Sequence, residues 1–204
     1  YYKRTIQGVI NLEKIKIKEV VTLVPGINPT RAQEQFKGQK IKYYDRSSFD
    51  SDFNYEDVLL EDEIKPLSQS TSSLSEGDVV ISNSLQLATM VGKNNVGKAL
   101  SINFTKVEFK NKLLDKRYFL FLFNVYKDVK RQKERELQGT GAVLRIPLRA
   151  IAEITIPVVP LKEQKKIGKI YIERMKLQSK LNKYSDLIEQ FTNSIIEESL
   201  KEDS

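Results

Sequence analysis

The chain has 204 residues, of which 40% are hydrophobic and 30% charged, and its formal net charge is +7 at neutral pH. This length suffices for one globular domain of about 100 to 150 residues and an appended segment. The absence of cysteine and histidine excludes thiolate nucleophiles, imidazole bases and the common zinc sites, so we expect no cofactor or metal. The sequence also shows neither a membrane-spanning stretch nor a secretory signal, and we expect a cytoplasmic protein.

The first half of the chain predicts short strands joined by loops. Residues 12–24 alternate partly between polar and apolar side chains, which indicates a strand with room for a short helical turn at 18–23. A serine-rich loop is expected at 68–75. The other strands that we expect here are 41–44, 57–60, 79–82, 87–91 and 99–104.

The periodicity then changes, because Leu120, Phe123 and Tyr126 fall at helical spacing. We expect one helix from about 115 to 133, buried on one side and basic toward its end. That end would point Lys127, Lys130, Arg131, Lys133 and Arg135 toward a partner. Beyond it the sequence predicts a loop at 138–141, a strand at 144–146, a turn at 148–152 and a strand at 154–157. These elements predict a compact α+β domain of mixed strands and helices over residues 1–159.

The last segment, 160–204, predicts a single long helix. Pro157 and Pro160 form a stiff joint, and proline suits the first turn of a helix. Nine positions follow alternating steps of three and four, and all but Arg174 are apolar: Ile167, Ile170, Arg174, Leu177, Leu181, Tyr184, Ile188, Phe191 and Ile195. This is the stripe of a coiled coil. A helix over 161–200 would be roughly 60 Å long, so we expect a partner helix, with folding back across its own domain as the alternative.

Charge is unevenly distributed along the chain. Residues 45–78 carry ten acids and two bases, whereas residues 93–135 carry twelve bases and four acids. A smaller basic cluster lies in the loop-like segment after Pro29, at Arg31, Lys37, Lys40 and Lys42. Both basic regions are candidates for phosphate contact, and an ordinary solvated face is the alternative.

One stretch, Ile154-Thr155-Ile156-Pro157-Val158-Val159-Pro160-Leu161-Lys162-Glu163-Gln164-Lys165-Lys166-Ile167, combines a strand, a double-proline joint and a helix start. With weaker matches at 17–21, 26–29, 41–44, 77–82 and 139–148, it resembles the DNA specificity subunits of type I restriction-modification enzymes. The sequence departs from that family in lacking tryptophan and in having Asn83-Ser84-Leu85-Gln86 where a glycine-rich turn is usual.

The resemblance implies a non-catalytic, sequence-specific reader of double-stranded DNA. Adenine methylation would belong to a modification subunit and cleavage to a restriction subunit. Members usually carry two recognition domains and two long helices, and this chain has one of each. It therefore resembles a half-subunit that forms a homodimer through the C-terminal helix and reads a bipartite palindrome, or a fragment of a longer subunit.

Two groups of side chains are candidates for DNA contact. Amide side chains can bond bidentately to adenine, so we expect base contacts from Asn83, Gln86, Asn94 and Asn95, although asparagine also serves in ordinary turns. Phosphate contacts are expected from Arg31, Lys40, Lys93, Lys98, Lys127, Lys130, Arg131 and Arg135.

Two other functions remain open. Glu61-Asp62-Glu63-Ile64-Lys65 contains the Glu-x-Lys pair of metal-dependent nucleases, with an upstream acid among Asp45, Asp50 and Asp52. The chain could also be a coiled-coil interaction module without a nucleic-acid role. Salt-sensitive binding to duplex DNA distinguishes a reader of DNA sequence from such an interaction module.

Overall fold

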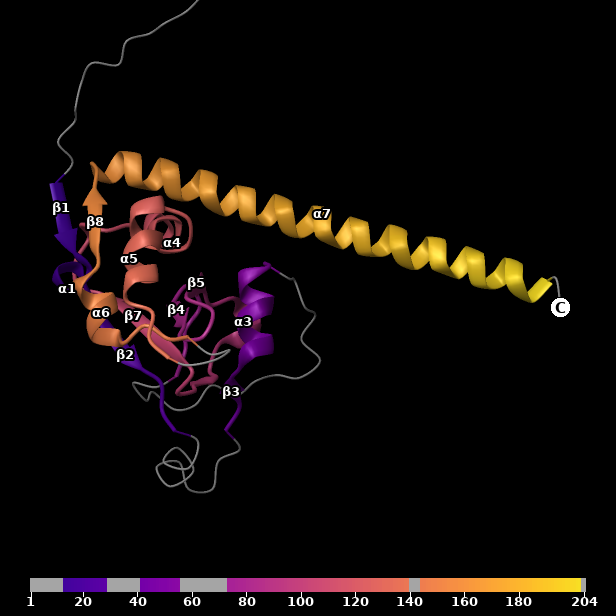
Figure 1. Ribbon diagram of the computed structural model, residues 1–204, viewed down its shortest axis with the longest axis horizontal. Coiled ribbons are helices and arrows are strands. Elements are labelled where there is room, and N and C mark those ends of the chain that lie inside the picture. The colour runs from indigo at the N-terminus through magenta and orange to yellow at the C-terminus, as the bar shows by residue number, and fades with distance from the viewer. Residues whose placement is uncertain (1–12, 29–40, 56–72, 140–143, 203–204) are drawn as a thin grey trace, which may run out of the picture.

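The computed structural model describes residues 13–28, 41–55, 73–139 and 144–202, which form a globular part packed beneath one end of a long helix (Figure 1). That helix, α7 (Leu161–Glu202), continues well beyond the globular part. The fold is thus a mixed strand and helix domain followed by one long C-terminal helix, as the sequence predicts. None of the helices in the described part of the chain combines the length and apolarity that a membrane span requires.

The central sheet has four antiparallel strands in the order β2 (Val21–Pro25), β7 (Phe104–Phe109), β4 (Val79–Ser82) and β5 (Leu87–Met90). All four residues of β4 are buried, as expected of an apolar run at the centre of a domain. Ser82 pairs with both Leu87 and Phe104, and Pro25 pairs with Thr105. All four strands therefore have one terminus at the same edge of the sheet, which we call the loop end.

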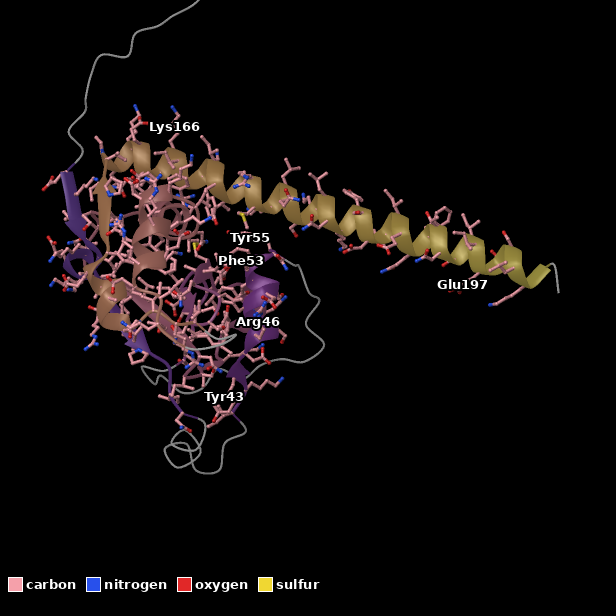
Figure 2. All side chains as sticks on the ribbon, in the orientation of Figure 1. Tyr43, Arg46, Phe53, Tyr55, Lys166 and Glu197 are labelled. Atoms are coloured by element: carbon pink, nitrogen blue, oxygen red, sulfur yellow. The ribbon has the colours of Figure 1, made fainter. Side chains whose placement is uncertain are left out.

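Two small sheets complete the strand pairing. β1 (Glu13–Lys16) pairs antiparallel with β8 (Thr155–Val158), which ties the first described strand to the end of the domain. β3 (Tyr43–Tyr44) pairs in parallel with β6 (Ala99–Leu100). Figure 2 shows Tyr43 at the end of the globular part that lies away from α7.

The described part of the chain has seven helical segments, α7 included. Among them, α4 (Lys116–Asn124) contributes Phe119, Leu120 and Phe123 to the main core and is capped by Asp115, whose carboxylate accepts from Arg117 N at 3.0 Å and Tyr118 N at 3.2 Å. The others described are α1 (Ile17–Val20), α3 (Arg46–Phe53), the 3-10 helix η1 (Lys93–Asn95), α5 (Lys127–Arg135), α6 (Leu148–Glu153) and α7.

The prediction of one helix over 115–133 is wrong, because the chain breaks between α4 and α5 at Val125 and Tyr126. The last residue of α4, Asn124, uses its side-chain amide on β5, accepting from Ala88 N at 2.8 Å and donating to Ala88 O at 2.8 Å. It also donates to the hydroxyl of Tyr171 on α7 at 2.9 Å. These tertiary bonds fix the end of α4, which helical spacing alone does not reveal.

Other boundaries also differ. The expected strand at 144–146 is reduced to an isolated pairing of Gln138 with Arg145, and the turn at 148–152 is the helix α6. The strand expected at 99–104 is two strands, β6 and β7, and α3 was not expected. The predicted strand at 57–60 lies outside the described residues.

The start of α7 is fixed by Gln164, whose side chain is 1% exposed. Its amide oxygen accepts from Asp115 N at 2.9 Å, and its amide nitrogen donates to Leu113 O at 2.8 Å and Val159 O at 2.7 Å. One turn later Gly168 lies so close to α4 that a Cβ there would be 2.7 Å from Tyr118 N. The first turns of α7 are therefore part of the domain, joined to it by polar bonds and close packing.

Replacing Gln164 with alanine should destabilise the joint, because three backbone groups lose their partner. We expect the free energy of unfolding in urea to fall by about 2 to 4 kcal/mol. Gln190→Ala, at an exposed position of the same helix, should change it by less than about 0.5 kcal/mol. Equal effects of the two substitutions would contradict this role for Gln164.

Candidate nucleic-acid interface

Three connections converge at the loop end of the sheet. The turn between β4 and β5 is bonded to the link between β6 and β7, where Asn83 N donates to Asn103 O at 3.0 Å. That link also borders the segment after β2, because Ile27 forms a bridge with Ser101 and Lys42 O accepts from Ala99 N at 2.9 Å. The loop end thus collects chain segments that are distant in sequence, as in binding sites carried by a rigid sheet.

The β4–β5 turn, residues 83–86, is held tightly. The Asn83 amide donates to Ile102 O at 3.3 Å and accepts from the Thr105 hydroxyl at 2.9 Å. Gln86 has a positive φ of 57°, which a non-glycine residue rarely adopts, and its side chain donates to Asn83 O at 2.5 Å. Its amide oxygen is buried and, in the described structure, has no hydrogen-bond partner. Two of the four amides that we expected to read bases, those of Asn83 and Gln86, therefore lie in this turn, where they are half-buried and already form hydrogen bonds.

A buried lysine supports the same turn from α5. Lys133 is 7% exposed, and its ammonium donates to Gln86 O and Phe123 O, each at 2.7 Å, while lying 4.2 Å above the centre of the Phe123 ring. Burial lowers the pKa of Lys133 to about 8. The expectation that Lys133 points toward a partner together with the other bases of its helix is therefore wrong.

The remaining bases of α5 face solvent. Lys127, Lys130, Arg131 and Arg135 are all exposed, and Arg131 forms a long ion pair of 3.8 Å with Asp128. Because Lys133 of the same helix reaches Gln86, the C-terminal end of α5 lies beside the β4–β5 turn. The exposed bases of α5 thus form a cationic surface that leads to the loop end.

A shallow hollow joins this turn to the chain that follows α5. It has a volume of about 300 Å³ and is lined by Asn83, Gln138, Arg145, Ile146, Pro147 and Leu148. Arg145 and Arg149 are both exposed in this region. We did not expect either arginine to take part in the site, although the Gly139 and Pro147 that flank Arg145 mark a loop of the kind that carries binding residues.

The residues of η1 lie at the other end of the β4–β5 hairpin. Asn95 is 3% exposed and its amide donates to Asp52 at 2.7 Å and to Ser48 O at 3.2 Å. Lys98, whose pKa is lowered by burial, donates to the Ser48 hydroxyl at 2.8 Å. Asn95 thus serves the core, and its amide is not presented to solvent.

Lys93, which is exposed, and Asn94 line a second hollow of about 690 Å³ near α7, together with Tyr55, Lys176 and Lys180. The structure therefore divides the candidate residues between two ends of the sheet, with Asn83, Gln86 and the end of α5 at one and η1 at the other. Arg31 and Lys40 lie outside the described residues.

The structure describes three of the acids that a nuclease site would use, and each of them binds a neighbouring group of the domain. Asp45 caps α3 by accepting from Ser48 N at 2.9 Å, and Asp50 pairs with Arg46. Asp52 accepts from the Tyr44 hydroxyl at 2.8 Å, and burial raises its pKa. Residues 61–65 lie outside the described residues. Within the part of the chain that the structure describes, no three side chains of the kinds that bind metals come together.

The family model of the type I restriction modification DNA specificity domain matches residues 10–195. The chain belongs to this family. The resemblance drawn from residues 154–167 is therefore confirmed, and members of the family are in general non-catalytic specificity subunits.

Two solved structures share the fold of this chain, and a third matches it with a lower TM-score. A chain from a structure on complex assembly and conformational transition of the type I R-M system is 16% identical, with a TM-score of 0.59, and the match covers 96% of this chain and 46% of that one. The HsdS subunit from Thermoanaerobacter tengcongensis is 14% identical, with a TM-score of 0.51, covering 90% and 42%. The type I S subunit from M. genitalium is 13% identical, with a TM-score of 0.47, covering 81% and 39%.

The specificity domain thus spans less than half the length of the solved chains that it matches. No curated protein matches it.

The buried ammonium of Lys133 should make stability depend on pH. Its pKa of about 8 in the folded state lies below the 10.5 of an unperturbed lysine, so between these values the unfolded chain binds more protons. Stability therefore rises with pH across this window. Relative to Lys133→Met, the free energy of unfolding of the wild type should rise by about 2 to 4 kcal/mol from pH 8 to 10.5.

Urea unfolding of both proteins across this range measures the difference, and Lys130→Met on the exposed face of α5 is the control. A stability difference between wild type and Lys133→Met that stays constant with pH would show that Lys133 keeps an ordinary pKa.

Proposed function

We propose that this chain reads a specific sequence in double-stranded DNA, as the non-catalytic recognition half of a type I specificity subunit. The observation that carries the proposal is the loop end of the sheet, where a rigid turn bearing Asn83 and Gln86 adjoins a cationic surface. Loops on a fixed sheet present side chains to base edges, while exposed lysines and arginines neutralise phosphates.

The proposed phosphate contacts come first from α5. Lys130, Arg131 and Arg135 are exposed on a helix whose end is bonded to the β4–β5 turn. This arrangement would hold the turn at a fixed height above the DNA backbone, so that base contacts follow from backbone contacts. Arg145, beside Asn83, extends the same surface. Arg31 and Lys40 keep their proposed role in phosphate contact, as do Lys93, Lys98 and Lys127.

The proposed base contacts are those of Asn83 and Gln86, with Asn94 as a candidate from η1. Bidentate bonding to adenine would require Gln86 to turn its amide away from Asn83 O. Because its amide oxygen has no partner where it lies in the described structure, this movement would relieve an unsatisfied polar atom. Asn95 stays outside the proposed interface since its amide is bonded in the core.

The proposed partners are a modification subunit that methylates adenine and a restriction subunit that cleaves DNA. This chain would supply recognition alone, without a catalytic residue or a cofactor. A second copy is proposed to join through α7, whose stripe stays exposed at Ile170, Leu177, Leu181, Tyr184, Ile188, Phe191 and Ile195, while Ile167 is partly buried against the domain.

Neutralising α5 should weaken DNA binding without regard to sequence. For a Lys130→Ala/Arg131→Ala/Arg135→Ala variant we expect the slope of log K against log salt to become shallower by about 3, because each phosphate contact releases about one counterion. Fluorescence anisotropy with a mixed-sequence duplex over a salt series measures this slope. Removing Lys162, Lys166 and Lys169 from α7 takes away the same charge and should leave the slope nearly unchanged.

Selection from a random duplex library tests the sequence-specific part. We expect enrichment of a bipartite site with two related half-sites, as two-fold symmetry demands. Absence of both enrichment and salt-dependent binding would favour the coiled-coil interaction module instead.

Phe191→Glu should prevent dimerisation, because it places a charge in the middle of the stripe at a residue that is 68% exposed in one chain. Light scattering should give the mass of one chain for this variant and twice that mass for the wild type. The helical circular dichroism of the domain should persist, since residues 181–201 of α7 are all exposed. Lys183→Glu, outside the stripe, is the matched control and should remain dimeric.

A further inference from the structure

The link between β6 and β7 forms a β-turn at the loop end of the sheet. Ser101 O accepts from Phe104 N at 3.0 Å, which closes the turn around its two central residues, Ile102 and Asn103. Both central residues are exposed, Ile102 to 53%. The turn therefore presents an isoleucine to solvent at the end of the domain where base contacts are proposed.

The β4–β5 turn holds both central residues of this turn through their carbonyl groups. The Asn83 side chain donates to Ile102 O at 3.3 Å, and the Asn83 backbone donates to Asn103 O at 3.0 Å. A residue that we propose to contact bases and the exposed isoleucine are thus bonded neighbours.

Two further segments fix the start of the same turn. The Ser101 hydroxyl donates to Tyr44 O at 3.1 Å. Gly26 lies so close to Ser101 that a Cβ at position 26 would collide with the Ser101 carbonyl. Because the backbone is held on both sides of Ile102 and a β-branched side chain has few rotamers, the methyl groups of Ile102 have a nearly fixed place before any partner binds.

An isoleucine at this place contributes little to the stability of the domain itself. Single exposed apolar residues are common on protein surfaces, but the central positions of turns usually carry glycine, proline, asparagine, aspartate or serine. Ile102 belongs to neither of the two buried clusters formed by the described residues. Its apolar surface would instead stabilise a complex in which a partner covers it with an apolar group.

In the major groove of DNA, the apolar group that a protein can cover is the 5-methyl group of thymine. The other base edges in this groove offer hydrogen-bond donors and acceptors. A T·A pair also offers N6 and N7 of adenine, which an amide such as that of Asn83 can bind. An apolar side chain beside an amide is therefore the complement of a T·A base pair.

We propose that Ile102 covers the 5-methyl group of a thymine in the recognition site and thereby selects a T·A pair at that position. This inference rests on the proposed function and adds a specificity-determining residue to it. Cytosine at the same position has no methyl group, and its N4 amino group would lose water beside the isoleucine without gaining a hydrogen bond. The isoleucine would therefore favour thymine and oppose cytosine.

Replacing thymine with uracil tests this contact, because it removes the methyl group and leaves every hydrogen-bonding group in place. In the duplex obtained by library selection, one thymine at a time is replaced with uracil within one half-site. Fluorescence anisotropy at fixed salt measures the dissociation constant. We expect a thymine at which this constant rises by about fourfold, the factor that corresponds to one buried methyl group.

Ile102→Ala identifies the side chain that makes the contact. At the sensitive position this variant should bind the thymine and uracil duplexes equally, and its midpoint of urea unfolding should match that of the wild type because Ile102 is exposed. Leu113→Ala is the matched control, since Leu113 is 59% exposed but lies beside the start of α7, where its carbonyl accepts from Gln164. This control should keep the difference between the two duplexes.

The outcomes separate this inference from the proposed function. A selected site that lacks a T·A pair, or that binds equally well with uracil at every thymine, would overturn the contact and leave sequence-specific recognition standing. A uracil effect that persists in Ile102→Ala would assign the methyl contact to another residue and overturn the inference as well. Failure of the selection to enrich any site would overturn the proposed function itself.

Discussion

The contact between the first turns of α7 and the domain is the constraint on which the architecture depends. Gln164 bonds both to Val159 in the joint and to Leu113 and Asp115 of the domain, and Gly168 allows the helix to touch the backbone of α4. Since α7 is roughly 60 Å long, a tilt of about 5° at this joint would move its far end by about 5 Å. A buried amide with three bonds restrains such a tilt better than apolar contacts alone, because hydrogen bonds depend on direction.

The same joint keeps the apolar stripe of α7 apart from the loop end of the sheet. α4 is apolar around most of its circumference, so it needs both the sheet and α7 as cover. Once α7 is fixed by that need, its stripe is turned away from the domain, and the loop end of the sheet lies on the side of the globular part away from α7 (Figures 1 and 2). The proposed association through α7 and the proposed DNA contacts at the loop end would therefore use separate surfaces.

Sequence patterns predicted the long helix and the buried strand β4 well, because each depends on a local periodicity or an apolar run. They failed where tertiary bonds decide a boundary, as at Asn124, whose amide ends α4 by bonding to β5. For the same reason the sequence did not predict which side chains of the candidate site are free to bind a partner. Charge density singled out the bases of α5, but only the fold shows that Lys133 is buried beneath the β4–β5 turn and that Asn95 bonds to Asp52. Arg145 is marked in the sequence only by the Gly139 and Pro147 that flank it, and the fold brings it beside Asn83.

The two ends of the β4–β5 turn are fixed partly through their backbone, with Gln86 O accepting from Lys133 and Asn83 N donating to Asn103 O. Leu85 of this turn packs against a second cluster of buried residues, but Ser84 beside it is exposed and takes no part in those two bonds. Substitutions there can change the chemistry of the tip while the scaffold beneath it stays the same. Under the proposed function, single amino-acid changes at this tip would therefore alter the DNA target of the domain while its fold stays intact.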